Sequence, residues 1–433
     1  MSEYTGYKGS SLLFLKTNKI LVGDSVKVFA DITYSGIVMP RYEHSDDKHI
    51  VLKLKSGYNI GLEIEKIEKI EKIEKNPHVE KNIQQNKEIQ KNQSLPSILL
   101  LSTGGTIASK IDYRTGAVTP VLTAEELNSS VPELAKIANI DTKVLFSEYS
   151  ENIMPEHWLK IAETIKEYSK SDYSGIIIAH GTDTMHYTSS YLSFSLAGFT
   201  IPIVLVGSQR SSDRASSDAA LNLIGAIKFL TKSNKTNGVY IAMHQDENDE
   251  AIACHIGTRV RKNHTSKRGA FQTIGSDPAF LVVNNEIHEN MKREFFTVNK
   301  FEPKIKINEK VALVKYHPGY NPDLLKNMID SGYKAIIFEG TGLGHIGKNM
   351  YPVIKIAKEK GIFMGMTSQC IDGRVRMTVY ESGRDLLNLG IIPLENMISE
   401  IALVKAMWIT GNTEKYDEIK ENMLNEIASE FTT

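Results

Sequence analysis

Two short apolar runs, each followed at once by glycine and threonine, constrain the fold of this chain more than any other feature. Residues 97–107 read SILLLSTGGTI, and residues 174–185 read SGIIIAHGTDTM. Continuous apolar runs of this length are typical of strands buried on both faces of a parallel sheet. The glycines then mark the carboxyl ends of the strands, where open α/β sheets bind ligands. We therefore expect Thr103, Thr182 and Asp183 to share one pocket.

The chain beyond residue 95 alternates apolar strand candidates with helical stretches. The strand candidates lie at residues 98–101, 143–146, 175–179, 202–206 and 238–242. The helical stretches between them lie at residues 124–128, 155–170, 185–196 and 217–230. This alternation predicts an α/β fold with a parallel sheet. A second block of the same kind begins near Val311, and residues 274–310, which have no sustained period, are expected to join two lobes.

The first part of the chain has a different pattern and predicts a small all-β module. Apolar and polar residues alternate at 23–29, 35–40 and 49–64, and clusters of Gly, Asp and Ser separate these segments. Short alternating segments with close turns are typical of antiparallel strands. We expect residues 1–75 to form a small β-barrel of SH3-like type.

A low-complexity stretch follows the all-β module. Isoleucines recur every three residues at positions 64, 67, 70 and 73, a period that fits neither a helix nor a strand. The Lys-, Asn- and Gln-rich residues after them predict a solvated linker, and a helix that binds a partner is the alternative. The predicted division is a β-barrel domain at 1–75, a linker at 76–96, a large α/β lobe at 97–300 and a smaller α/β lobe at 301–433.

Composition excludes several classes of function. The 433 residues carry a formal net charge of −1, so no global basic field attracts nucleic acid. The two cysteines, Cys254 and Cys370, are too few and too distant for a disulfide framework or a metal cluster, and we expect both to be free and buried. The first residues lack the pattern of a signal peptide, and no apolar run reaches the ~20 residues of a membrane span. We expect a soluble cytoplasmic protein.

The hydroxyl of a threonine is a weak nucleophile and needs a base. A desolvated lysine can serve, and Lys262 stands in the charged stretch 258–271, TRVRKNHTSKRGAF, where most charges are expected at the surface. From the residues alone, roles without catalysis remain open for all of these positions. The TGGT turn at Thr103 fits a plain tight turn or a phosphate loop. Asp183 fits a helix cap. No local pattern favours Lys262 over the neighbouring cations as the base.

Two other motifs predict little chemistry. The glycines of residues 342–347, GLGHIG, match the dinucleotide fingerprint, but the next strand candidate ends without the carboxylate that such a site needs. The histidines show no spacing typical of zinc ligands, so we predict no catalytic metal.

Four motifs in order resemble the asparaginase–glutaminase family of two-threonine amidohydrolases across residues 97–410. They are TGGTIAS at 103–109, HGTDT at 180–184, VGSQR at 206–210 and RKNHTS at 261–266. The resemblance implies an asparaginase-like fold of two α/β lobes with parallel sheets. It also implies that Thr103 is the nucleophile, that Thr182, Asp183 and Lys262 are the second threonine, aspartate and lysine, and that this chain needs no cofactor.

The same resemblance implies a set of substrate-binding residues. Ser150 and Glu151, in SEYSENIMPEHW, resemble the pair that holds the α-carboxylate and amino group of the substrate. Tyr113 resembles the tyrosine of a mobile loop near the nucleophile, and Gly181 belongs to the same substrate-binding set. The backbone N–H groups of the glycine turns are expected to hold the oxyanion.

The N-terminal module extends the resemblance to the whole chain. The strings YSGIVMPRYE, GYNIGLEI and QRSSDRASSDAALNL resemble the D-subunit family of archaeal glutamyl-tRNA(Gln) amidotransferases, with Ala215 where a proline is expected. The resemblance implies that glutamine is hydrolysed and that ammonia passes to the E subunit, which uses ATP and magnesium to convert Glu-tRNA(Gln) to Gln-tRNA(Gln). It further implies that tRNA(Gln) binds mainly through the partner and that two copies of this chain form a homodimer within a D2E2 heterotetramer, away from membranes.

Two other functions remain open from the sequence. A free-standing L-asparaginase with an N-terminal extension is one alternative. A non-catalytic scaffold or RNA-binding protein built on an inactive amidohydrolase is the other, but all four expected catalytic positions hold competent residues.

Overall fold

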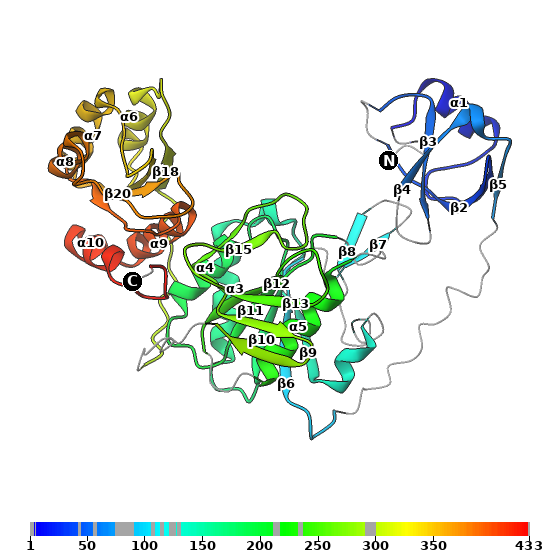
Figure 1. The fold of residues 1–433 in the computed structure, drawn as a ribbon, viewed down its shortest axis with the longest axis horizontal. Coiled ribbons are helices and arrows are strands. Elements are labelled where there is room, and N and C mark those ends of the chain that lie inside the picture. Colours follow the sequence, from blue (N-terminus) through cyan, green and yellow to red (C-terminus); the bar gives the residue numbers. More distant parts are fainter. Residues whose placement is uncertain are drawn as a thin grey trace.

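The computed structural model describes residues 4, 6–41, 45–54, 59–73, 91–104, 109–112, 117–120, 127, 131–210, 217–232, 237–290 and 300–431. Within them the strands form sheets of five, eight and four strands and two separate strand pairs. Figure 1 shows the three sheets as successive groups of elements along the chain, from blue through green to red.

The first sheet is antiparallel and has the strand order β4-β3-β2-β1-β5. Its strands are β1 (Ser25–Phe29), β2 (Thr33–Val38), β3 (His49–Leu54), β4 (Asn59–Glu63) and β5 (Lys69–Lys72). The prediction of an all-β module is wrong in one respect, because helix α1 (Gly9–Thr17) precedes the strands. Leu15 of this helix is fully buried in the same core as Val26 and Val28 of β1. Packing against the sheet therefore fixes the position of the helix.

The isoleucine-rich stretch also differs from its prediction. A single 3-10 turn, Ile64–Lys66, is followed by strand β5, which pairs with β1 and places Ile70 opposite Val28. A 3-10 helix has three residues per turn, so this turn accounts for the spacing from Ile64 to Ile67. The period of three therefore spans two short elements, and the conclusion that no strand fits there is wrong.

The eight-stranded sheet is mixed, with the order β17-β16-β13-β12-β11-β10-β6-β9. Its parallel strands are β6 (Ser97–Ser102), β9 (Asn139–Val144), β10 (Gly175–Ala179), β11 (Ile203–Val206) and β12 (Val239–His244). Its antiparallel strands are β13 (Ala251–Ile256), β16 (Phe280–Val283) and β17 (Glu286–Glu289). The prediction of a wholly parallel sheet is therefore wrong at one edge. The segment expected only to join the lobes supplies β16 and β17. Strand β9 begins four residues before the predicted 143–146 and ends within it.

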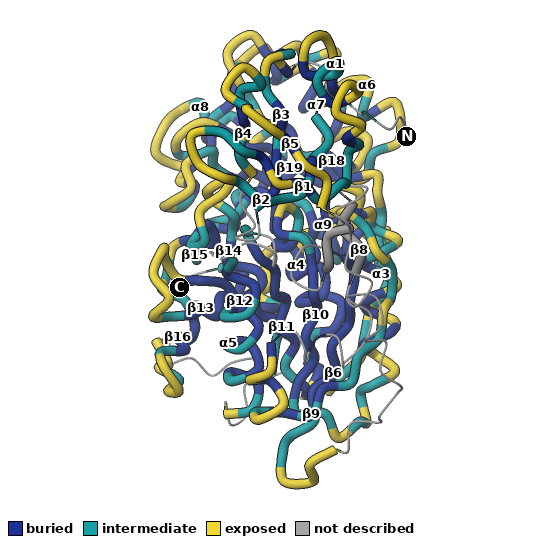
Figure 2. Tube along the Cα trace, turned by 90° about the vertical axis from the view of Figure 1, so that its right-hand side faces the viewer, coloured by how far each residue is buried: buried dark blue, intermediate teal, exposed yellow. Residues whose placement is uncertain are grey.

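Alternate residues of the parallel strands face opposite layers, as the pleat requires. Leu99, Ile176 and Ile178 pack against helices α3 (Pro155–Glu167) and α4 (Met185–Ser195). Ile98 and Ile177 pack on the opposite face against α5 (Ala219–Lys232). The strands β10, β11 and β12 are buried throughout, as Figure 2 shows in dark blue.

The four-stranded sheet of the smaller lobe is parallel and has the order β18-β19-β20-β21. Its strands are β18 (Val311–Lys315), β19 (Ala335–Gly340), β20 (Phe363–Ser368) and β21 (Ile392–Pro393). Its helices are α6 (Pro322–Asp330), α7 (Tyr351–Glu359), α8 (Glu381–Asn388), α9 (Ser399–Asn412) and α10 (Tyr416–Leu424). Helix α9 packs against α4 of the larger lobe, so one hydrophobic core joins the two lobes.

Two short strand pairs complete the fold. Strands β7 (Ser109–Asp112) and β8 (Ala117–Pro120) form one pair, and β14 (Val260–Lys262) and β15 (Phe271–Thr273) form the other. No helix among the described residues is long and apolar enough to cross a membrane. The predicted domain boundaries at residues 75, 96 and 300 stay predictions, and most of the helix expected at 124–128 lies outside the described residues.

Candidate active site

The first glycine turn fixes Thr103 at the carboxyl end of β6. The N–H and the hydroxyl of Thr103 both donate to the carbonyl of Ala179, at 3.1 and 2.9 Å, and the side chain is fully buried. Gly104 follows with φ of +111°, and a Cβ there would lie 2.3 Å from the carbonyl oxygen of Glu148. Only glycine fits this backbone, so the sharp turn that ends β6 depends on it.

The second glycine turn follows β10, the neighbouring parallel strand. A Cβ at Gly181 would lie 2.8 Å from the Cβ of Ser150, and a Cβ at Gly207 would lie 2.9 Å from the methyl group of Thr182. Gly181 therefore allows the segment that carries Ser150 to approach the turn, and Gly207 allows Thr182 to approach the loop after β11. The turn therefore presents Thr182 and Asp183 at the same sheet edge as Thr103.

Lys262 reaches the second turn from strand β14. Its Nζ donates to Thr182 Oγ1 at 2.9 Å and to Asp183 Oδ1 at 2.7 Å. The lysine side chain is 10% exposed, whereas the Asp183 side chain is 65% exposed. The structure thus joins Lys262 by hydrogen bonds to two residues that precede it by 80 and 79 positions. An amine, a hydroxyl and a carboxylate in contact can move a proton and hold a cationic group.

Ser150 lies at the same turn, and its surroundings tie two segments together. The Ser150 hydroxyl donates to Asp183 Oδ2 at 3.4 Å, and the Thr184 hydroxyl donates to the Ser150 carbonyl at 2.7 Å. Ser150 is buried, and Glu151, in the same 3-10 turn, is exposed. Tyr113 lies outside the described residues.

Sequence reasoning missed the role of His180 as support for the second turn. The His180 ring donates from Nδ1 to the Gly181 carbonyl at 2.6 Å and accepts from the Thr188 hydroxyl at Nε2, at 2.8 Å. Burial lowers the pKa of His180 to about 4, so the ring is neutral at pH 7 and can act as donor on one side and acceptor on the other. Its position directly before the Gly-Thr pair is the one signal of this role in the sequence.

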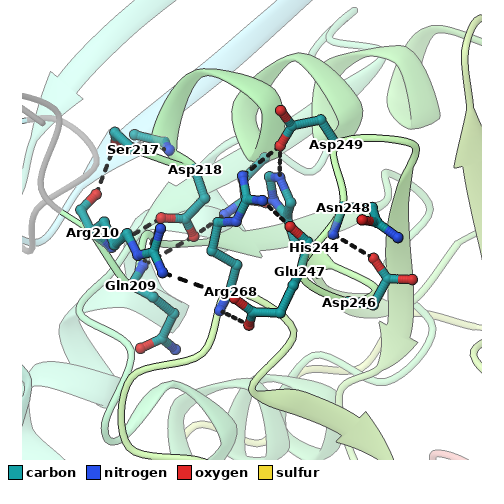
Figure 3. Close-up of polar contacts among 12 residues, drawn as sticks. Gln209, Arg210, Ser217, Asp218, His244, Asp246, Glu247, Asn248, Asp249 and Arg268 are labelled. Carbon is teal, nitrogen blue, oxygen red and sulfur yellow. Dashed lines mark hydrogen bonds and ion pairs between the residues drawn. The ribbon is translucent and has the colours of Figure 1, made fainter. Parts of the chain in front are cut away.

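A second polar network supports the loop after β11, and Figure 3 shows it. The buried carboxylate of Asp218 accepts from the backbone N–H groups of Gln209 and Arg210 at 2.9–3.1 Å. Asn222 links Asp218 to the carbonyl of Gly207 and to the buried ring of His244. The network fixes the loop that contacts Thr182, and the VGSQR motif gave no sign of it.

Arg268 extends this network to the arm between β14 and β15. Its guanidinium binds the Asp249 carboxylate and the Glu247 carbonyl, both in the turn between β12 and β13 (Figure 3). The expectation that most charges of residues 258–271 lie at the surface is wrong for Arg259, which is 1% exposed. Cys254 is buried as predicted, but Cys370 is exposed. The described residues contain no cluster of three or more His, Cys, Asp or Glu side chains able to hold a metal ion.

Family models match three parts of the chain. The Asparaginase, N-terminal model matches residues 97–295, the Glutaminase/Asparaginase C-terminal domain model matches 310–423, and the GatD N-terminal domain model matches 20–73. The D subunit of the glutamyl-tRNA(Gln) amidotransferase of Pyrococcus abyssi is 45% identical over 427 residues, which cover 97% of each chain. The chain belongs to the D-subunit family of glutamyl-tRNA(Gln) amidotransferases. The D subunit of Methanococcus maripaludis strain C7 is 46% identical, and the match covers 95% of this chain and 98% of that one.

Solved structures resemble the two lobes of this member of the D-subunit family. The thermostable L-asparaginase from Thermococcus kodakarensis is 32% identical with a TM-score of 0.71, and the match covers 78% of this chain and 99% of that one. L-asparaginase I from Vibrio cholerae is 25% identical with a TM-score of 0.68 and is matched over its full length, which covers 78% of this chain. The two lobes therefore have the asparaginase-like fold.

Proposed function

We propose that this chain is a glutaminase that hydrolyses the side-chain amide of glutamine through Thr103 and supplies the ammonia to a partner subunit. The contact of Lys262 with Thr182 and Asp183, at the sheet edge that also carries Thr103, is the observation on which the proposal rests. Each group has a role in amide hydrolysis, and the family membership favours an amide as substrate.

The proposed reaction starts at the Thr103 hydroxyl. Its oxygen attacks the amide carbon of the substrate, and Lys262, paired with Thr182, accepts the proton and delivers it to the leaving ammonia. Water then releases glutamate from the glutamyl ester. The Thr103 hydroxyl donates to the Ala179 carbonyl, so its hydrogen has to turn about the Cβ–Oγ1 bond to meet the base during attack. Backbone N–H groups of the glycine turns hold the oxyanion.

The substrate-binding residues form the remainder of the proposal. Ser150 and Glu151 hold the α-carboxylate and amino group of glutamine, with Gly181 beside them. Asp183 positions the Thr182–Lys262 pair, and its second carboxylate oxygen, 3.4 Å from the Ser150 hydroxyl, is placed to bind the ammonium group of the substrate. Tyr113 is proposed as a further substrate-binding residue.

The partner in the proposal is the E subunit of the amidotransferase. This partner holds ATP and magnesium, binds most of the tRNA(Gln) and amidates its glutamyl group in the cytoplasm, within a D2E2 heterotetramer. The near-zero net charge of this chain supports that division, because a chain without a global basic field leaves tRNA binding to the partner. The N-terminal sheet, matched by the GatD N-terminal domain model, is proposed to be a barrel of SH3-like type.

The test is amide formation on Glu-tRNA(Gln) with purified chain, glutamine, ATP and magnesium, with and without the partner subunit. We expect Gln-tRNA(Gln) only when both subunits are present, with loss of product in a Thr103→Val variant. Glutamine-dependent amidation by the partner alone would contradict the proposal.

A free-standing L-asparaginase is the second candidate, and the 32% identity to the Thermococcus kodakarensis L-asparaginase favours it. The two candidates differ in what the isolated chain does. Fast asparagine hydrolysis without tRNA or partner, together with no amidation of Glu-tRNA(Gln), would select the asparaginase.

A further inference from the structure

Strand β14 carries Lys262 and lies between the two lobes. Successive side chains of a strand point to opposite faces, so Arg261 lies on one face of β14 while Val260 and Lys262 share the other, and Arg259 directly precedes the strand. Val260 is fully buried in the hydrophobic core, and Lys262 contacts Thr182 and Asp183. The two arginines face the smaller lobe, as their contacts show.

The start of β14 is held by both lobes. Arg259 Nη1 donates to the carbonyls of Asn396 and Glu430, both at 3.1 Å, and these two residues belong to segments beyond β21. The preceding Gly257 carbonyl accepts from the Ser189 hydroxyl of α4 at 2.7 Å. The base of the strand is therefore fixed, and antiparallel pairing with β15 holds its backbone as far as Lys262, which lies opposite Phe271. The remaining freedom at the far end is the direction of the side chains.

The far end has one ion pair with the smaller lobe. Arg261 Nε lies 2.9 Å from Oε1 of Glu400, in the first turn of α9. The Ser399 hydroxyl lies 3.1 Å from Glu400 Oε2 and 3.2 Å from Glu339 Oε1, so its one proton is shared between the two carboxylates. Glu400 is 7% exposed, and a cavity of about 20 Å³ beside the pair has room for a single water. Solvent therefore reaches the carboxylate of Glu400 little, whereas the side chain of Arg261 is one-third exposed.

On its opposite side, Lys262 has one hydrogen bond to Thr182, which is 9% exposed, and one ion pair with Asp183. Asp183 is 65% exposed, and an ion pair between partners of which one is so exposed holds geometry weakly. Because Arg261 and Lys262 are successive strand residues, the direction of one side chain sets the direction of the other.

We propose that the Arg261–Glu400 pair is a positioning device, by which the smaller lobe orients β14 so that Lys262 meets Thr182 and Asp183. The proposal rests on the proposed function for its effect on catalysis, and on geometry alone for its effect on Lys262. Arg261 and Glu400 act through Lys262 and do not touch the substrate.

The first test compares Arg261→Met, Glu400→Gln and the double variant in glutamine hydrolysis by the full chain with its partner. We expect kcat to fall between about 10- and 100-fold in each single variant, because a displacement of an ångström at a reacting group has this effect, while KM stays within about twofold. The double variant should be no slower than the worse single variant, since both remove the same contact. Arg261→Lys, which keeps the charge, should recover part of kcat.

Arg374→Met is the matched control. Arg374 Nη1 lies 3.3 Å from Glu395 Oε2 within the smaller lobe, and its side chain is 32% exposed, against 33% for Arg261. This variant should keep kcat. Unchanged kcat in both Arg261→Met and Glu400→Gln, or an equal loss in Arg374→Met, would overturn the proposal.

The second test does not depend on activity. Lys262 is only 10% exposed, so brief acetylation with acetic anhydride, read by peptide mass spectrometry, should modify it slowly in the wild-type chain. Labelling should rise severalfold in Arg261→Met and Glu400→Gln and stay at the wild-type level in Arg374→Met. A wild-type chain without glutaminase activity would refute the proposed function while this test still decides the positioning. Equal labelling of Lys262 in all variants would refute the positioning.

Discussion

At the scale of single residues, the proposed reaction depends on proton transfer by Lys262. Lys262→Met removes the amine and keeps much of the side-chain volume. We expect kcat for glutamine hydrolysis to fall about 10²–10⁴-fold, the usual contribution of a positioned acid or base, with little change in the melting temperature. Lys262→Arg is the matched variant, because it keeps the positive charge but cannot accept a proton at neutral pH, and it should be as slow. Near-normal kcat in either variant would remove Lys262 from the mechanism.

Gly104 provides a test of the first turn. In Gly104→Ala the new Cβ would lie 2.3 Å from the Glu148 carbonyl oxygen and force a residue with φ of +111°. We expect a loss of about 1–3 kcal/mol in the free energy of unfolding, measured by denaturant titration. Gly319→Ala is the control, because φ there is +82° but no atom lies within 4 Å of the added Cβ. Equal losses in the two variants would mean that contact with Glu148 does not constrain the turn.

The residues of the candidate site were predictable only in part. The Gly-Thr turns after two apolar runs are enough to indicate Thr103 and Thr182, because the carboxyl ends of parallel strands meet at one edge. Lys262 could not be separated from Arg259 and Arg261 by local pattern. Their partners, Thr182, Glu430 and Glu400, are far away along the chain, and the sequence does not state which contact each cation makes.

At the scale of elements, the buried His255 of strand β13 predicts how the free energy of unfolding depends on pH. Burial lowers the pKa of His255 to about 3, whereas the unfolded chain binds this proton near pH 6.5. The unfolded state therefore binds more protons as the pH falls below about 6.5, and the free energy of unfolding decreases in that window. Between pH 7 and pH 5 this one residue should account for about 2 kcal/mol of lost stability.

Denaturant titrations of wild type and His255→Asn at several pH values measure this contribution. The amide of the new asparagine can still meet the Thr273 hydroxyl, which lies 2.8 Å from Nδ1 of His255. The variant should lose less stability than the wild type between pH 7 and pH 5, and the two should run parallel between pH 7 and pH 8. Parallel curves over the whole range would contradict the prediction.

The elements themselves divide by how well the sequence predicts them. The strands β6, β10, β11 and β12 were predictable because burial on both faces leaves continuous apolar runs. The antiparallel strands β16 and β17 are short and partly exposed, so their alternation is weak, and the pattern there predicts a connection instead. Helix α1 and strand β5 were missed for a related reason, since packing against the first sheet decides their structure more than their own pattern does.

At the scale of the whole molecule, the Glu430 carbonyl accepts from Arg259 of the larger lobe, and a buried ion pair holds Glu430 to α9. Lys405 of α9 and Glu430 are both fully buried with Nζ and Oε1 2.5 Å apart. Glu430→Ala leaves the lysine without its carboxylate and should destabilise the chain by about 3–5 kcal/mol in a denaturant titration. Glu418→Ala, which breaks the exposed pair with Lys415, should have only a small effect. A loss in Glu430→Ala no larger than in Glu418→Ala would show that the buried ion pair with Lys405 does not stabilise the fold.

The residue that carries the covalent intermediate can be identified directly. The chain is mixed with glutamine, quenched with acid within a turnover and digested, and the peptides are identified by mass spectrometry. We expect a glutamyl ester on the Thr103 hydroxyl and none in Thr103→Val. An ester on Thr182, or one that persists on another residue of Thr103→Val, would contradict this expectation.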